Sequence, residues 1–315
     1  MECDVTGKTI IGAGLAGLMS ACVFKDASII DAMPEPKESH KALLRFRDES
    51  VSILTGIPFK KVQVYKEVFE DDKCLPYCTN RAANLYAQKV TGHIAGRSIR
   101  NLESVARYVA PDDFYGQLLG RFKDRIEWGK KLESEFVQRS LKSGHVLINT
   151  APLGIITKTI GVEVVGDFSF DKKAIHVDRY LLPEGSDVYQ TVYFPDPATP
   201  VYRASITGRM LIVESIGGDF SQLSLSNVRS AFGLWNVDLD PLDSVDQKYG
   251  KIVDLPREVR EAVLHELSNK YNIFSVGRFA TWRNILLDDV VNDIYTVDRL
   301  VRSSGYGRSL LVSSI

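Results

Sequence analysis

Residues 8–31 read KTIIGAGLAGLMSACVFKDASIID, and this stretch decides the fold. The β-branched run at residues 8–11 predicts a short strand, and the apolar run after it predicts a helix that ends near Phe24. Residues 27–31 then predict a second strand that ends in Asp31. The order of strand, glycine turn, helix and strand is typical of a nucleotide-binding unit at the edge of a parallel sheet.

Three glycines in this turn have the G-x-G-x-x-G spacing. Such glycines allow a tight turn, a close approach of the backbone to a pyrophosphate, and close packing of the helix on the sheet. The N-terminus of the helix would face the phosphates with N–H groups that have no partner within the helix. The carboxylate of Asp31 can accept hydrogen bonds from a ribose. We therefore predict that the dinucleotide-binding residues are Gly12, Ala13, Gly14, Leu15, Ala16, Gly17 and Asp31.

A signal peptide or membrane segment is the alternative for this apolar stretch. Residues 1–8 carry two acidic residues and one basic residue, which is not the positively charged start of a signal peptide. The apolar run is also shorter than the roughly 20 residues of a membrane span. We expect neither, and no membrane partner.

The composition is that of a soluble globular chain. It has 315 residues, of which 44% are hydrophobic and 25% charged, enough for two substructures. The net charge of −1, from 39 basic and 40 acidic residues, does not indicate DNA as a partner, although a balanced total can hide a local basic groove. The few cysteines include one C-x3-C pair, which we interpret as structural or incidental, so we expect reduced thiols and no metal.

The middle of the chain changes from alternating strands and helices to an antiparallel pattern. Strands are predicted at residues 59–69, 125–128 and 145–152, and helices at 80–90, 112–122 and 257–271. Antiparallel strands are predicted at residues 162–165, 188–194, 202–206 and 210–214, with a hairpin turn at Thr207-Gly208. Residues 217–254 are predicted to be rich in loops. The aromatic residues of the antiparallel part either line a substrate site or fill the core: Tyr189, Tyr193, Phe194 and Tyr202.

A second strand–glycine–helix pattern lies near the C-terminus. Residues 273–282 predict a strand that runs into Gly277, and a helix with acidic residues at its start is predicted from Asp288 to Leu300. Arg278 would lie where the strand opens into a cleft, the alternative being a surface ion pair. Trp282 either stacks on a planar ring or is simply buried. Arg45, in an arginine-containing stretch at residues 41–47, suits a phosphate or flavin cleft, or a solvated helix face.

These motifs resemble the group of flavin-dependent amine oxidases and UDP-galactopyranose mutases. The resemblance rests on residues 12–17 with Asp31, on residues 149–152, and on residues 277–282 before Asp288. It implies FAD, bound by the glycine turn together with Arg45, Gly277 and Asp288. Leu287 precedes Asp288 where the mutases carry methionine, and residues 39–41 replace the glycine pair that follows the second strand in both families.

The resemblance also implies the fold and its division. The expected class is α/β: a Rossmann-type FAD-binding domain with a parallel sheet and helices, and an inserted antiparallel-sheet substrate domain. We expect the FAD-binding domain at residues 1–60, 105–158 and 265–315, and the substrate domain at residues 61–104 and 159–264.

Three functions follow from this resemblance. In the first, an amine-oxidase-type enzyme oxidises a C–N bond of an amine or an amino-acid-derived substrate, with His40, Lys41 and Arg278 as catalytic residues. The chain is similar in size, and at residues 40–45, to compact bacteriophage flavoproteins, some of them linked to thymidine hypermodification. That similarity implies an amino-acid adduct on a modified nucleotide, free or in DNA, in a bacterial or phage-infected cytoplasm. The alternatives are a mutase that uses reduced flavin on a sugar nucleotide, and a non-catalytic FAD-binding protein. The oligomeric state stays open.

Overall fold

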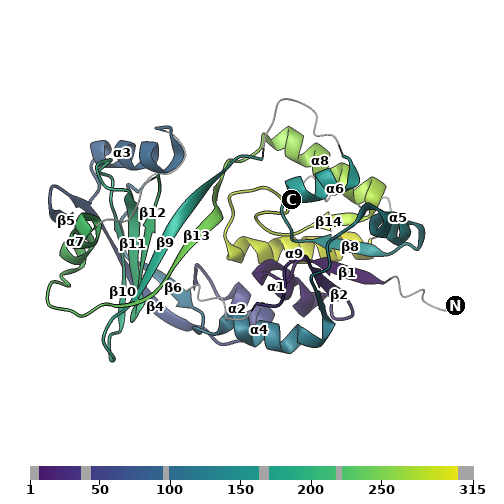
Figure 1. The fold of residues 1–315 in the computed structure, drawn as a ribbon, viewed down its shortest axis with the longest axis horizontal. Coiled ribbons are helices and arrows are strands. Elements are labelled where there is room, and N and C mark those ends of the chain that lie inside the picture. Colours follow the sequence, from purple (N-terminus) through teal and green to yellow (C-terminus); the bar gives the residue numbers. More distant parts are fainter. Residues whose placement is uncertain (1–6, 37–43, 95–98, 163–169, 218–221, 304–315) are drawn as a thin grey trace. The chain divides into compact units, whose positions relative to one another are not determined.

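The chain folds into two compact units. A computed structural model describes residues 7–36, 44–94, 99–162, 170–217 and 222–303 (Figure 1). Unit 1 comprises Met1–Lys60, Val109–Asp171 and Ile252–Ile315, and unit 2 comprises Lys61–Tyr108 and Lys172–Lys251. The sequence analysis predicts the last three boundaries between the two domains after residues 104, 158 and 264, and each of them differs from the boundary in the structure. The last differs because α8 (Arg257–Tyr271) packs on β14 (Ile273–Ser275) and so belongs wholly to unit 1.

Unit 1 contains a parallel sheet with the strand order β14-β8-β1-β2-β7. Its other strands are β1 (Lys8–Ile11), β2 (Ser28–Asp31), β7 (Ile126–Trp128) and β8 (Val146–Asn149), and each neighbouring pair is parallel. All four residues of β8 are buried, as expected for a central strand covered on both faces. The strands predicted near residues 8, 28, 126 and 146 are therefore confirmed.

Helices surround this sheet in two groups (Figure 1). In the first, α1 (Leu15–Val23) contacts α2 (Ser50–Thr55), α4 (Phe114–Phe122) and α9 (Leu287–Arg302). In the second, α5 (Ser134–Lys142) contacts both α6 (Leu153–Ile160) and α8. The short strand β3 (Arg45–Phe46) and the 3₁₀ helix η1 (Lys123–Arg125) complete the unit. The helix α9, which the sequence predicts from the acidic residues at its start, buries a stripe at helical spacing: Val290, Ile294, Val297 and Leu300.

Unit 2 is built on a mixed sheet with the order β13-β9-β12-β11-β10-β4-β6, in which β5 also pairs with β4. The strands are β4 (Lys60–Glu70), β5 (Lys73–Leu75), β6 (Val105–Val109), β9 (Lys172–Leu181), β10 (Val188–Tyr193), β11 (Val201–Gly208), β12 (Met210–Ser215) and β13 (Asp240–Ile252). The pairs β10–β11, β11–β12 and β12–β9 are antiparallel, but β10 and β4 are parallel. The inserted sheet is therefore mixed: the predicted antiparallel pattern holds for those three pairs but not between β10 and β4.

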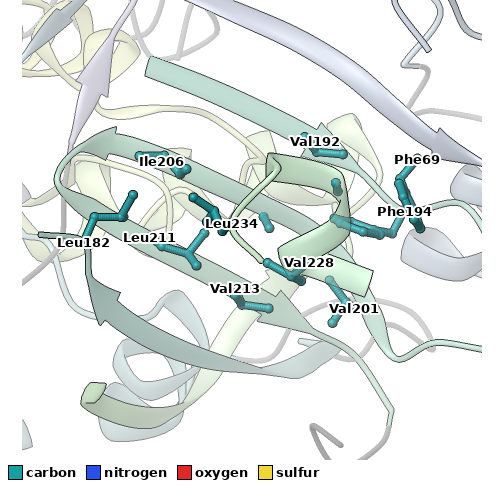
Figure 2. Packing of buried hydrophobic residues seen from close by; sticks show 12 residues of the cluster. Phe69, Leu182, Val192, Phe194, Val201, Ile206, Leu211, Val213, Val228 and Leu234 are labelled. Carbon is teal, nitrogen blue, oxygen red and sulfur yellow. The ribbon is translucent and has the colours of Figure 1, made fainter. Parts of the chain in front are cut away.

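Each face of the unit 2 sheet packs against a helix. Figure 2 shows the cluster in which Val192, Ile206 and Leu211 of the sheet meet Val228 and Leu234, from α7 (Gln222–Phe232) and the turn after it. A second cluster joins the sheet to α3 (Asn80–Thr91) through buried residues that include Val68, Tyr86 and Tyr202. Phe194 and Tyr202 are 1% and 0% exposed, so these two aromatic residues belong to the core.

One prediction for unit 2 is wrong, and one of its strands was missed. Residues 217–254 contain α7 and the 13-residue strand β13, although their sequence was interpreted as loops, and the strand β9 was not predicted. The strand β13 stands at the end of the strand order and reads DPLDSVDQKYGKI, without the clear apolar alternation that marks a half-buried strand. The predicted strand at residues 162–165 lies almost entirely outside the described residues. No helix among the described residues is long and apolar enough to cross a membrane.

Candidate cofactor site

The three glycines of the first turn have different roles. Gly12 has φ +103°, a conformation that favours glycine, and a Cβ there would stand 2.6 Å from Oγ1 of Thr150. A Cβ on Gly17 would overlap the carbonyl oxygen of Gly12, so this glycine lets α1 pack against the turn. Gly14 has φ −72°, and a Cβ there would meet no atom within 4 Å. The middle glycine therefore keeps space open in front of the helix.

Asp31 joins the end of β2 to this turn. Its Oδ2 accepts the N–H of Ala13 at 2.7 Å, and its Oδ1 accepts the N–H of Met33 at 2.8 Å. The phenol of Tyr115 donates to the carbonyl oxygen of Ala13 at 3.1 Å. Burial, and then the charge of Asp31, raise the pKa of Tyr115. The turn is thus fixed by side chains from β2 and α4.

A cavity of about 1040 Å³ opens in front of the turn, and all its lining residues belong to unit 1. Its walls are mainly apolar side chains from the glycine turn, α6, the segment after β14 and the start of α9. The volume is slightly above the roughly 300–1,000 Å³ that is usual for small-molecule sites. Its charged residues are Asp31, Arg45, Lys130, Lys131, Arg278 and Asp288.

The C-terminal glycine packs the second motif against the first. Gly277 has φ +89°, and a Cβ there would lie 3.1 Å from Cβ of Ala16 on α1. Its N–H donates to Oδ2 of Asp293 at 3.2 Å, and Asp293 also accepts hydrogen bonds from Arg283. Gly277 is therefore a packing residue beside the cavity, whereas the next residue, Arg278, lines it.

The start of α9 is fixed by a residue whose role the sequence did not reveal. The N–H of Arg47 donates to Oδ1 of Asp288 at 3.1 Å, and its Nε donates to Oδ2 at 3.2 Å. Asp289 accepts the N–H of Leu286 at 2.9 Å, as in a capping box. Residues 285–288 line the cavity, so the positive end of the helix faces it.

The structure brings most of the predicted site residues together. Those that line the cavity are Gly12, Gly14, Leu15, Ala16, Asp31, Arg45, Arg278 and Asp288, and those directly beside it are Ala13, Gly17 and Gly277. His40 and Lys41 lie outside the described residues. Their roles in binding or catalysis stay predictions.

Trp282 does not belong to the site. It is 1% exposed, has φ +50° and donates from Nε1 to the carbonyl oxygen of Val253 at 2.9 Å. Its ring and that of Phe170 form a T-shaped pair, with 5.1 Å between the ring centroids. It is absent from the described cavity lining, so the prediction that it stacks on a ligand ring is wrong and the burial alternative is correct.

Two lysines of the cavity lining had no clear signal in the sequence, whereas Thr150 belongs to the motif at residues 149–152. Lys130 and Lys131 follow β7, and the N–H of Lys130 donates to the carbonyl oxygen of Asp31 at 2.8 Å. Thr150 follows β8, and its Oγ1 donates to the carbonyl oxygen of Ile11 at 2.7 Å. The two lysines could have been found from their position after a predicted strand, because ligands bind at the carboxyl ends of parallel strands. Within the described residues, no cluster of His, Cys, Asp or Glu could hold a metal ion.

Comparisons with known proteins agree with this architecture. No family model and no curated protein matches the sequence. The structure of a reduced UDP-galactopyranose mutase matches with a TM-score of 0.65, covering 97% of this chain and 99% of that chain at 13% identity. The chain shares the fold of that mutase. The expected fold class, a parallel sheet with helices and a second, inserted sheet, is confirmed.

Two further solved structures have the same fold. A CLA-producing fatty acid isomerase from P. acnes gives a TM-score of 0.59 over 95% of this chain and 99% of that chain, at 12% identity. Klebsiella pneumoniae HpxO, complexed with FAD and uric acid, gives 0.56 over 98% and 83%, at 13% identity. These neighbours are different enzymes, so the fold alone does not select one reaction.

Proposed function

We propose that the protein is an FAD-dependent oxidoreductase of the amine-oxidase type, which oxidises a C–N bond of an amine or amino-acid-derived substrate. The observation that carries the proposal is one large cavity lined both by the glycine turn with Asp31 and by Arg278 with the start of α9. Such a cavity offers a site for a dinucleotide with its phosphates at one helix N-terminus and its reactive ring near another.

The turn fits the phosphates and ribose of FAD. None of the described residues accepts a hydrogen bond from the N–H groups of Gly14, Leu15 and Ala16, and all three residues line the cavity. These donors suit the oxygen atoms of a pyrophosphate. Each oxygen of Asp31 accepts one backbone N–H and keeps a further lone pair for a ribose hydroxyl.

The opposite part of the cavity suits the flavin ring and a substrate. Bound FAD would supply the redox chemistry by accepting a hydride from the carbon next to nitrogen. The apolar lining, which includes Phe46, Ile156 and Leu286, disfavours a charged ammonium and so favours the neutral amine. Arg278 can grip a substrate carboxylate with two parallel hydrogen bonds. His40 and Lys41 remain our predicted groups for deprotonating the amine or positioning water.

The finer substrate follows from the resemblance of residues 40–45 to compact phage flavoproteins. We infer an amino-acid adduct on a modified thymidine, oxidised to an imine that water then cleaves, in a bacterial or phage-infected cytoplasm. The modified thymidine is either part of DNA or a free nucleotide, and the proposal covers both cases.

A second candidate function is a UDP-galactopyranose mutase-like reaction, supported by the matching fold of the mutase. In that case Arg278 would hold the diphosphate of a sugar nucleotide. The two reactions differ in their net redox change, because an isomerase returns its flavin to the starting state and an oxidase passes electrons to an acceptor. A non-catalytic FAD-binding protein is the third candidate.

A visible spectrum of the purified protein, followed by mass analysis of the released cofactor, tests the cofactor. We expect a yellow protein that releases FAD, and not FMN or NAD. A colourless protein that binds NADPH alone after attempted FAD reconstitution would refute the proposal.

Anaerobic mixing with amines and amino-acid-modified thymidines then tests the reaction. Bleaching of the flavin, with an aldehyde or keto product, supports the amine-oxidase type. Isomerisation of a sugar nucleotide by pre-reduced enzyme, without net oxidation, supports the mutase. FAD that no substrate bleaches or reoxidises supports the non-catalytic protein.

A further inference from the structure

Several backbone N–H and carbonyl groups of the glycine turn form hydrogen bonds with residues from distant parts of the chain. The N–H of Gly12 donates to Ile30 O at 2.8 Å, and Thr150 donates from its backbone N–H and from Oγ1 to Ile11 O. The residue between the first two glycines, Ala13, is held on both sides. Its N–H is bound by Asp31 and its carbonyl oxygen by the phenol of Tyr115.

The hydrogen bond from Tyr115 fixes the direction of the next N–H group. The carbonyl of Ala13 and the N–H of Gly14 belong to the same peptide unit, which is planar and trans, so they point in opposite directions. Because Tyr115 holds the carbonyl oxygen at 3.1 Å, rotation of this peptide would break that bond. Gly14 lines the cavity, and a Cβ there would meet no atom within 4 Å.

We propose that Tyr115 is a positioning residue for a ligand diphosphate: by holding the carbonyl of Ala13, its phenol aims the N–H of Gly14 at the phosphate oxygens. Tyr115 lies 102 positions from Ala13 and is delivered by the first turn of α4, which packs on α1. The inference rests on the proposed function in one respect, that the ligand carries a diphosphate.

The chemistry of the phenol suits this role. A hydroxyl can donate to a carbonyl, whereas a phenolate cannot. A tyrosine phenol is protonated at neutral pH, and burial and the nearby carboxylate of Asp31 raise the pKa of Tyr115 further. A phenylalanine at this position would keep the ring and leave the carbonyl without its hydroxyl donor.

The test compares two ligands on the full chain after the cofactor has been removed. Binding of ADP and of adenosine is measured by calorimetry for the wild type, Tyr115→Phe and the control Tyr295→Phe. Tyr295 lies on α9 and is 46% exposed. For Tyr115→Phe we expect ADP to bind about threefold to tenfold more weakly, the range for one lost hydrogen bond, with adenosine binding changed less than about twofold. The control should bind both ligands as the wild type does.

Other results would overturn either the role of Tyr115 or the proposed function. Equal weakening of ADP and adenosine would make Tyr115 a general structural residue and overturn the inference. Unchanged ADP binding, or a wild-type protein that binds no ADP, would also overturn it. If ADP binding follows the expected pattern but the protein never takes up FAD, the proposed function fails while the role of Tyr115 stands.

Discussion

Arg47 and Asp288 are joined twice, although 241 positions separate them in the chain: the backbone N–H and the Nε of Arg47 each donate to one carboxylate oxygen. The side chain of Asp288 is 3% exposed, while that of Arg47 is 43% exposed. The carboxylate therefore anchors the segment after β3 to the start of α9. The strand β3 itself and the start of α9 both line the cavity.

Asp288→Asn should weaken this anchor. The amide offers only one acceptor oxygen, so one of the two hydrogen bonds loses its partner inside the protein. We expect the free energy of unfolding to fall by about 1–3 kcal/mol, measured by urea denaturation. The matched control is Asp298→Asn, whose partner Arg302 is 73% exposed, and its effect should stay below about 1 kcal/mol. If the two variants lowered the free energy of unfolding equally, the contact of Arg47 with the buried Asp288 would stabilise the protein no more than the pair of Asp298 with the exposed Arg302 does.

Gly14→Val should abolish retention of FAD without unfolding the protein. The φ of −72° permits a branched residue, and the new side chain would fill the empty space before α1. The backbone conformation of Gly14 therefore imposes no strain on a valine. The loss is checked by the ratio of flavin to protein absorbance after gel filtration.

Gly120→Val is the control for that substitution. Gly120 is an exposed residue of α4 and, like Gly14, has no atom within 4 Å of an added Cβ. This variant should keep its flavin. A folded Gly14→Val protein with stoichiometric FAD would remove Gly14 from the binding site.

Arg278→Lys should lower activity and leave folding intact. Lysine keeps the charge but cannot reproduce two parallel hydrogen bonds to a carboxylate or phosphate. We expect kcat/KM to fall at least about tenfold, or roughly 1.4 kcal/mol, with thermal stability and FAD content near those of the wild type. Arg302→Lys, on the exposed side of α9, is the control. Normal turnover with a much lower melting temperature would make Arg278 a structural residue.

His176 makes the stability of unit 2 depend on pH. Its Nδ1 lies 2.8 Å from Asp246 of β13, and its Nε2 lies 3.3 Å from Asp178 and 2.9 Å from Ser244. The hydrogen bond with Asp246, together with the charge of Asp178, raises the pKa of His176 above 6.5. Since the folded state holds the proton more tightly, this stabilisation is complete below pH 6.5 and is lost as pH rises through the raised pKa.

His176→Gln tests that dependence by chemical denaturation at several pH values. The difference in stability between wild type and variant should be largest near pH 5.5 and should shrink by pH 8.5. His265→Gln is the control, since His265 lies on α8 of unit 1, near the neutral Asn269. A wild-type advantage that is constant over this range would contradict the assigned titration.

The sequence predicted the parts of the structure that depend on local patterns. The glycine turn at Gly12 has a characteristic spacing and the helix α9 has a characteristic acidic start, and the structure confirms both elements. The roles of Arg47 and Tyr115 could not be predicted, because each depends on a partner more than 100 positions away. The edge strand β13 was not predicted for another reason, because its polar sequence lacks the apolar alternation of a half-buried strand.

The division of unit 1 among three chain segments also sets an order of events during synthesis. The glycine turn lies at the start of the chain, whereas Asp288 and the rest of the cavity wall on α9 emerge about 270 residues later. At roughly 5–20 residues per second, on the order of 10–60 s pass between synthesis of the glycine turn and synthesis of the cavity wall on α9. Under the proposed function, FAD can therefore meet the complete cavity only after α9 has been translated.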